Sequence, residues 1–178
     1  MYVKERTKEE IEQKILSMSD LIQIEYLESA VRVLGESVDT RRFVHEKLSE
    51  LYFKRGMLKE AARHMASAAL FCATYREITR VKIREAELHI AAGDYESADS
   101  AFRQAGANSN KQEKEKLLEL RKILYFKQAL EHEKNVRNSH ALKIYERMYS
   151  EDRSSELKEK LKGLYQRLGK IQEFRQLG

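Results

Sequence analysis

The stretch AAGDYESADSAFRQAGA, residues 91–107, contains a spacing of small and large side chains that occurs again elsewhere in the chain. Gly93 is followed at five, nine and twelve residues by Ala98, Phe102 and Ala105. Thirty-seven residues earlier the same spacing selects Gly56, Ala61, Met65 and Ala68. Such a recurring small–large–small pattern is typical of a repeated pair of helices, in which alanine allows the two helices to approach closely.

The composition and the helix-start signals favour helix throughout the chain. Its 178 residues include no proline and only 7 glycines, so few residues interrupt regular structure. Thr7 with Glu10, and Thr74 with Glu77, have the spacing of capping boxes. We therefore predict an all-α array of antiparallel helix hairpins, with ten helices in five pairs at residues 8–18, 20–34, 40–55, 58–73, 75–92, 95–105, 111–135, 139–150, 154–168 and 170–177.

Two weaker copies of the spacing follow the first two. The third has Val136 where glycine would stand, followed by Ala141, Tyr145 and Met148, and a truncated fourth has Tyr165, Gly169 and Phe174. The pattern resembles the tetratricopeptide repeat, although the repeat length is 37 residues and the usual terminal proline is missing. The resemblance implies a single α-solenoid domain over 1–178. Residues 1–36 would form an atypical first pair, 40–106 the best repeats, and 111–178 degenerate repeats with a truncated C-terminal cap.

Side chains with catalytic or metal-binding potential are few and scattered. None of the five histidines has another at the spacing that places two metal ligands on one helical face. His89 and His132 occupy the repeat position of Tyr52, which predicts packing between helices; a metal site at His132 and His140 is the weaker alternative. Cys72 lies in an alanine-rich segment, which favours a buried thiol. We expect no enzyme activity, no metal ion and no cofactor.

In tetratricopeptide arrays the first helices of successive pairs line a groove that binds a partner. The resemblance therefore implies a protein-binding scaffold or adaptor for a helical or extended peptide segment. Its groove residues would be Phe43, Glu46, Glu50, Lys54, Arg80, Ile83, Glu87, Ile90, Phe126, Leu130 and Lys134. Ordinary mixed helix surface is an equally weighted alternative. The lysine and asparagine with which cochaperone members hold a terminal carboxylate are absent from every copy, which argues against that function.

An alternative function is docking on RNA or the ribosome. The formal net charge is +5, and Arg76, Arg80 and Arg84 are spaced four apart on one predicted helical face. A second basic cluster comprises Lys158, Lys160, Lys162, Arg167 and Lys170. Glutamates lie among both clusters, which favours ordinary solvated helix faces over a nucleic-acid site.

The segment YQRLGKIQEFRQLG, residues 165–178, carries apolar residues that no following pair would cover. They are Leu168, Ile171, Phe174 and Leu177. Either this apolar side folds back onto the helix at 154–168, or part of it contacts a partner or forms a homodimer.

The remaining features predict a cytoplasmic protein without a membrane partner. A single cysteine fits a reducing compartment. The N-terminus is charged from its fourth residue, unlike a signal peptide, and no apolar run is long enough to span a bilayer.

Overall fold

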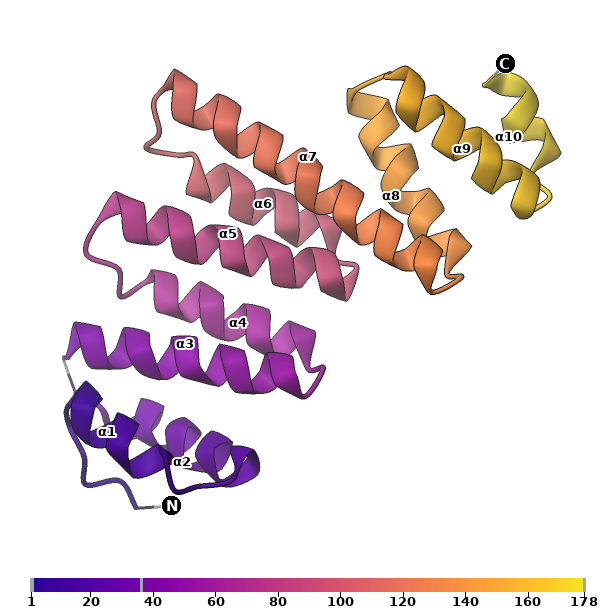
Figure 1. Cartoon of the computed structure of the whole chain (residues 1–178). Helices are drawn as coiled ribbons and strands as arrows, with labels where there is room; N and C mark the ends of the chain where they lie inside the picture. Colours follow the sequence, from indigo (N-terminus) through magenta and orange to yellow (C-terminus); the bar gives the residue numbers. More distant parts are fainter. Residues whose placement is uncertain (1, 36, 178) are drawn as a thin grey trace. The chain divides into compact units, whose positions relative to one another are not determined.

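The computed structural model describes residues 2–35 and 37–177 (Figure 1), and these residues form ten α-helices and no β-strand. The helices are α1 (Lys8–Ile15), α2 (Asp20–Val33), α3 (Val38–Lys54), α4 (Leu58–Ala69), α5 (Tyr75–Ala92), α6 (Tyr95–Ala105), α7 (Lys111–Lys134), α8 (Asn138–Glu151), α9 (Ser155–Arg167) and α10 (Ile171–Gln176). The predicted all-α class is confirmed, and every boundary lies within four residues of the predicted one.

The chain divides into two compact units, residues 1–113 and 114–178, here called the N-terminal and C-terminal units. In the N-terminal unit each helix from α2 to α6 packs against the next, and α1 packs against α3. Figure 1 shows α3, α4 and α5 as successive layers of this unit. In the C-terminal unit α9 packs against both α8 and α10. The expectation of a single repeat domain over the whole chain stays a prediction.

The same turn joins four of the helix pairs. A backbone N–H after each turn donates to a carbonyl five residues earlier, at 2.8–2.9 Å: Met57 to Tyr52, Asp94 to His89, Arg137 to His132, and Lys170 to Tyr165. The residue just before each donor has a positive φ, which is the geometry of a Schellman helix end. These residues are Gly56 at 73°, Gly93 at 77°, Val136 at 57° and Gly169 at 68°. The repeat positions aligned from the sequence thus occupy equivalent places.

Small residues fill the helix crossings of the three complete repeats. Five residues after each turn, Ala61, Ala98 and Ala141 are 0% exposed. The small residues seven before each turn, Ser49, Ala86 and Ala129, are also buried, as are the larger residues nine after it, Met65, Phe102 and Tyr145. The repeated spacing is therefore a packing pattern, in which alanine permits close approach and the larger side chain fills the adjoining space.

Candidate partner-binding face

Three contacts join the exposed sides of α3 and α5 in the N-terminal unit. Arg42 pairs with Glu77, which also completes the capping box of α5 with Thr74. Arg80 donates to Glu46 at 3.1 Å, and the Arg84 guanidinium lies 4.9 Å from the Phe53 ring centroid. We call the surface formed by these residues, together with Glu50, Ile83 and Glu87, the α3–α5 face. It carries charges of both signs, and its exposed aromatic residue, Phe53, lies beneath a guanidinium.

Most of the predicted groove residues of α3 and α5 lie on or beside this face. Glu46 is paired with Arg80, Glu87 accepts from Arg84 at 2.7 Å, and Glu50 pairs with Lys47. Lys54 is exposed and Ile83 is half-buried. Phe43 is half-buried against the first apolar core, with the Lys8 ammonium over its ring.

Ile90 was expected in the groove, but it is only 2% exposed and belongs to the interior. Its equivalent 37 residues earlier is Phe53, which is 43% exposed and lies on the α3–α5 face. Lys54, the residue predicted at that end of α3, aligns instead with Ala91. Applying the repeat length strictly would have identified Phe53. The exchange of an exposed phenylalanine for an enclosed isoleucine depends on which neighbours cover each site, and spacing does not reveal that.

The remaining predicted groove residues lie on α7, in the C-terminal unit. Phe126 is half-buried and meets the Tyr145 ring edge-on, with ring centroids 5.7 Å apart. Leu130 is half-buried and Lys134 is exposed. Phe126 therefore serves internal packing between α7 and α8 at least in part.

The two basic clusters are largely paired with carboxylates. In the first, Arg80 and Arg84 contact Glu46 and Glu87, whereas Arg76 is exposed and has no ion pair with any described residue. The pairing lowers the excess positive charge available to phosphate groups.

The second cluster shows similar pairing on α9 and at the start of α10. Lys160 and Arg167 approach Glu133 of α7 at 3.1 and 3.4 Å. Lys162 and Lys170 pair with Glu159 and Glu173. These contacts leave a mixed surface of both charges rather than a basic stripe.

Two buried histidines, His45 and His64, meet between α3 and α4, and the sequence analysis missed their contact. Their Nδ1 atoms are 3.1 Å apart. They are nineteen residues apart and lie on different helices, so spacing within one helix could not reveal them. The other histidines lie in helices, close to the turns: His89 of α5 lies 3.5 Å from the Asp94 carboxylate, and the rings of His132 in α7 and His140 in α8 are 5.3 Å apart.

Cys72 is half-buried, and its Sγ donates to the Ala68 carbonyl at 3.6 Å. Burial raises the pKa of the thiol, which disfavours the reactive thiolate. Across residues 2–35 and 37–177, no group of three or more His, Cys, Asp or Glu side chains is arranged to hold a metal ion. Within the same part of the chain, no helix is both long and apolar enough to cross a membrane.

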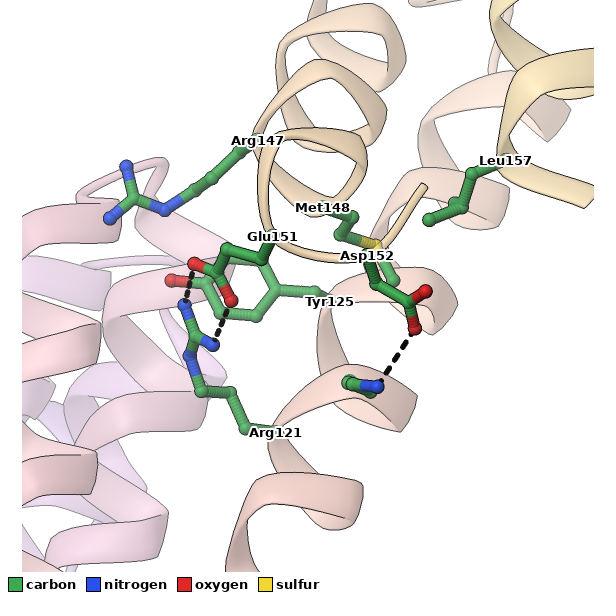
Figure 2. A pocket seen from close by; sticks show the side chains of 8 residues that line it. Arg121, Tyr125, Arg147, Met148, Glu151, Asp152 and Leu157 are labelled. Atoms are coloured by element: carbon green, nitrogen blue, oxygen red, sulfur yellow. Dashed lines mark hydrogen bonds and ion pairs between the residues drawn. The ribbon is translucent and has the colours of Figure 1, made fainter. Parts of the chain in front are cut away.

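A small pocket lies between α7, α8 and α9 of the C-terminal unit (Figure 2). Tyr125, Met148 and Leu157 line it. Two ion pairs flank it: Arg121 holds Glu151 in a bidentate contact at 2.6 and 2.7 Å, and Lys122 meets Asp152 at 2.8 Å. Its volume is about 30 Å³, whereas a benzene-sized ligand occupies cavities of about 150 Å³. We therefore assign the pocket to packing.

The predicted association surface is only partly covered. α10 packs against α9, and Leu168, Phe174 and Leu177 are half-buried, yet Ile171 remains 63% exposed. Phe174 stands where the complete repeats have their crossing alanine, five residues after the turn. Complete fold-back of the apolar side is therefore not observed, and the homodimer stays a prediction.

Comparison with known proteins found no matching family model, no matching curated protein and no matching solved structure.

Proposed function

We propose that the chain is a non-catalytic protein-interaction scaffold of tetratricopeptide-like type. Its α3–α5 face binds a helical or extended segment of a partner protein. The observation that carries the proposal is the set of three contacts from α5 to α3, at Glu77, Arg80 and Arg84. They hold the exposed sides of two successive first helices in one surface.

Phe53 is the anchor of the proposed interaction. An aromatic residue offers a large contact area, and such residues dominate the binding energy of many interfaces. Because Arg84 lies over its ring, the side chain is already oriented, which reduces the entropy lost on binding. The carboxylates and guanidinium groups around it would select a partner segment of complementary mixed charge.

The same proposal places the protein in the cytoplasm, since its single thiol needs no oxidising compartment. Docking on RNA or the ribosome is the alternative. It is supported chiefly by the exposed Arg76 and the net charge of +5, and it is weakened by the ion pairs of Arg80 and Arg84.

Site-specific photocrosslinking in cell extract tests the proposal. A photoreactive residue at position 53 should capture a partner protein, whereas the same residue at the exposed positions Arg63 of α4 and Arg103 of α6 should not. A second experiment places the photoreactive residue at position 50. Adding Phe53→Glu to this chain should abolish capture while leaving the helix content and melting temperature unchanged.

Crosslinks confined to positions 63 and 103 would contradict the α3–α5 face as the binding surface. Capture of RNA or ribosomal proteins in a manner that weakens steeply with salt, and that Arg76→Glu reduces, would favour the alternative.

A further inference from the structure

A polar cluster lies between α2, α3 and α4 in the N-terminal unit. His45 is 8% exposed and His64 is 4% exposed, and their Nδ1 atoms are 3.1 Å apart. A hydrogen bond at this distance requires one Nδ1 to carry a hydrogen and the other to accept it. If both rings were protonated, two N–H groups and two positive charges would face each other without intervening water.

The surrounding contacts define the neutral arrangement of the pair. The His64 Nε2 lies 3.1 Å from the Glu28 carboxylate of α2, and only a protonated Nε2 can donate to it. In neutral His64 the Nδ1 is then the acceptor, so His45 donates from its own Nδ1. Tyr52 stacks on His64 and donates to the same Glu28 oxygen at 3.1 Å, while Phe71 stacks on His45. Every polar atom of the His64 ring is thus satisfied in the neutral state.

We propose that the His45–His64 pair is an acid-sensitive lock that holds α3 against α4 when both rings are neutral and releases the helices when both are protonated. One added proton can be accommodated on His64, beside the Glu28 carboxylate, if the hydrogen of His45 moves to Nε2. A second added proton cannot be accommodated, because both Nδ1 atoms would then carry a hydrogen and oppose each other in a buried site.

The charges facing the pair agree with this arrangement. Burial lowers the pKa of His45 to about 4, and the neighbouring His64, Arg41 and Arg63 act in the same direction, against Glu28. Burial also lowers the pKa of His64, which Glu28 and Glu60 partly offset and Arg63 reinforces.

The direction of the pH effect follows from these shifts. Between the ordinary histidine pKa of 6.5 and about 4, the unfolded chain binds protons that the folded pair excludes. Stability contributed by the pair is therefore present above pH 6.5 and is lost as the pH falls towards 4. Because α3 also carries Glu46 and Phe53, acid would loosen the α3–α5 face; this consequence rests on the proposed function, whereas the lock itself does not.

Urea unfolding of the purified full chain from pH 7.5 to 4.5 tests the lock without any partner. The slope of unfolding free energy against pH gives the number of protons taken up on unfolding. Near pH 5, the wild-type chain should take up about one proton more on unfolding than the His45→Gln variant does. Glutamine keeps an amide donor at this position but cannot titrate. Arg103→Gln, at an exposed residue of α6 that does not titrate in this pH range, should match wild type.

Nuclear magnetic resonance titration of the five wild-type histidines gives an independent readout if His45→Gln fails to fold. The signals of His45 and His64 should titrate below the ordinary value and should shift when Glu28→Gln is introduced. Burial also lowers the pKa of His132, but that signal should not respond to Glu28→Gln. Equal proton uptake by wild type and His45→Gln, or titration of His45 and His64 near 6.5 in the folded protein, would overturn the proposal.

Discussion

The N-terminal and C-terminal units build the same helix-hairpin turn from different residues. Gly56 and Gly93 supply the positive φ in the N-terminal unit, whereas the β-branched Val136 adopts it at the first such turn of the C-terminal unit, whose second such turn uses Gly169. The closing hydrogen bonds have nearly the same length, 2.9 Å at the two glycines and 2.8 Å at the valine. Helix packing around the crossing alanines therefore imposes the turn, and the left-handed conformation of valine is tolerated at a cost.

The units also differ in the polar groups that they bury between helices. The N-terminal unit buries the neutral His45–His64 pair, whereas the C-terminal unit holds the half-buried Glu133 beside the Tyr145 hydroxyl and Lys160. Burial by itself would raise the pKa of Glu133, but the hydroxyl and the nearby cations outweigh it and lower that pKa. Acid should thus act on the His45–His64 pair at a higher pH than on Glu133.

The substitution with the largest expected effect removes the hydrogen bond from Tyr145 to the Glu133 carboxylate in the C-terminal unit. Tyr145 is fully buried and donates to Glu133 at 2.7 Å, so Tyr145→Phe removes a hydrogen bond to a charged group with little change of volume. We expect a loss of about 1.5–3 kcal/mol in unfolding free energy, measured by urea denaturation. Tyr75→Phe is the control, because Tyr75 is 66% exposed. A loss no larger than in the control would show that the hydrogen bond adds nothing to stability.

A second pair of substitutions asks whether the two units use the same helix crossing. Ala98→Leu in α6 and Ala141→Leu in α8 each place a larger side chain where no space remains. Each should lower the unfolding free energy by about 1–3 kcal/mol through overpacking. Ala107→Leu, at an exposed position, should leave it within about 0.5 kcal/mol of wild type. If Ala98→Leu unfolds at the same urea concentration as wild type, the repeat register described above is wrong.

The smallest expected effect concerns the turn residue itself. Val136→Gly should stabilise the chain by about 1 kcal/mol, because relief of the left-handed strain exceeds the added entropy of the unfolded chain. The converse change, Gly93→Val, should lower the unfolding free energy by about 1–2 kcal/mol. The cause would be backbone strain and not a steric clash, because a Cβ at Gly93 would meet no atom within 4 Å. Thermal unfolding of both variants measures the two shifts. Shifts of the same sign would contradict the equivalence of the turns.

The sequence by itself determined the local structure, because local structure depends on neighbours three to five residues away. The capping boxes at Thr7 and Thr74 form as predicted, and Asn110 and Glu113 bond reciprocally in the same manner. Each relies on a side chain and a backbone N–H within one helical turn. The spacing after Gly93 likewise identified the crossing alanines, since residues at fixed helical intervals share one side of a helix.

Only the tertiary structure decided which side chains meet across helices and which are enclosed. His45 contacts His64 over nineteen residues, and Arg80 reaches Glu46 over thirty-four. Ile90 is enclosed while Phe53, its equivalent, is exposed. The helical period specifies that such residues lie on one side of their own helix, but the neighbouring helix decides what that side touches. Burial, pairing and the protonation of the histidine pair therefore follow from packing between helices that are distant in the chain.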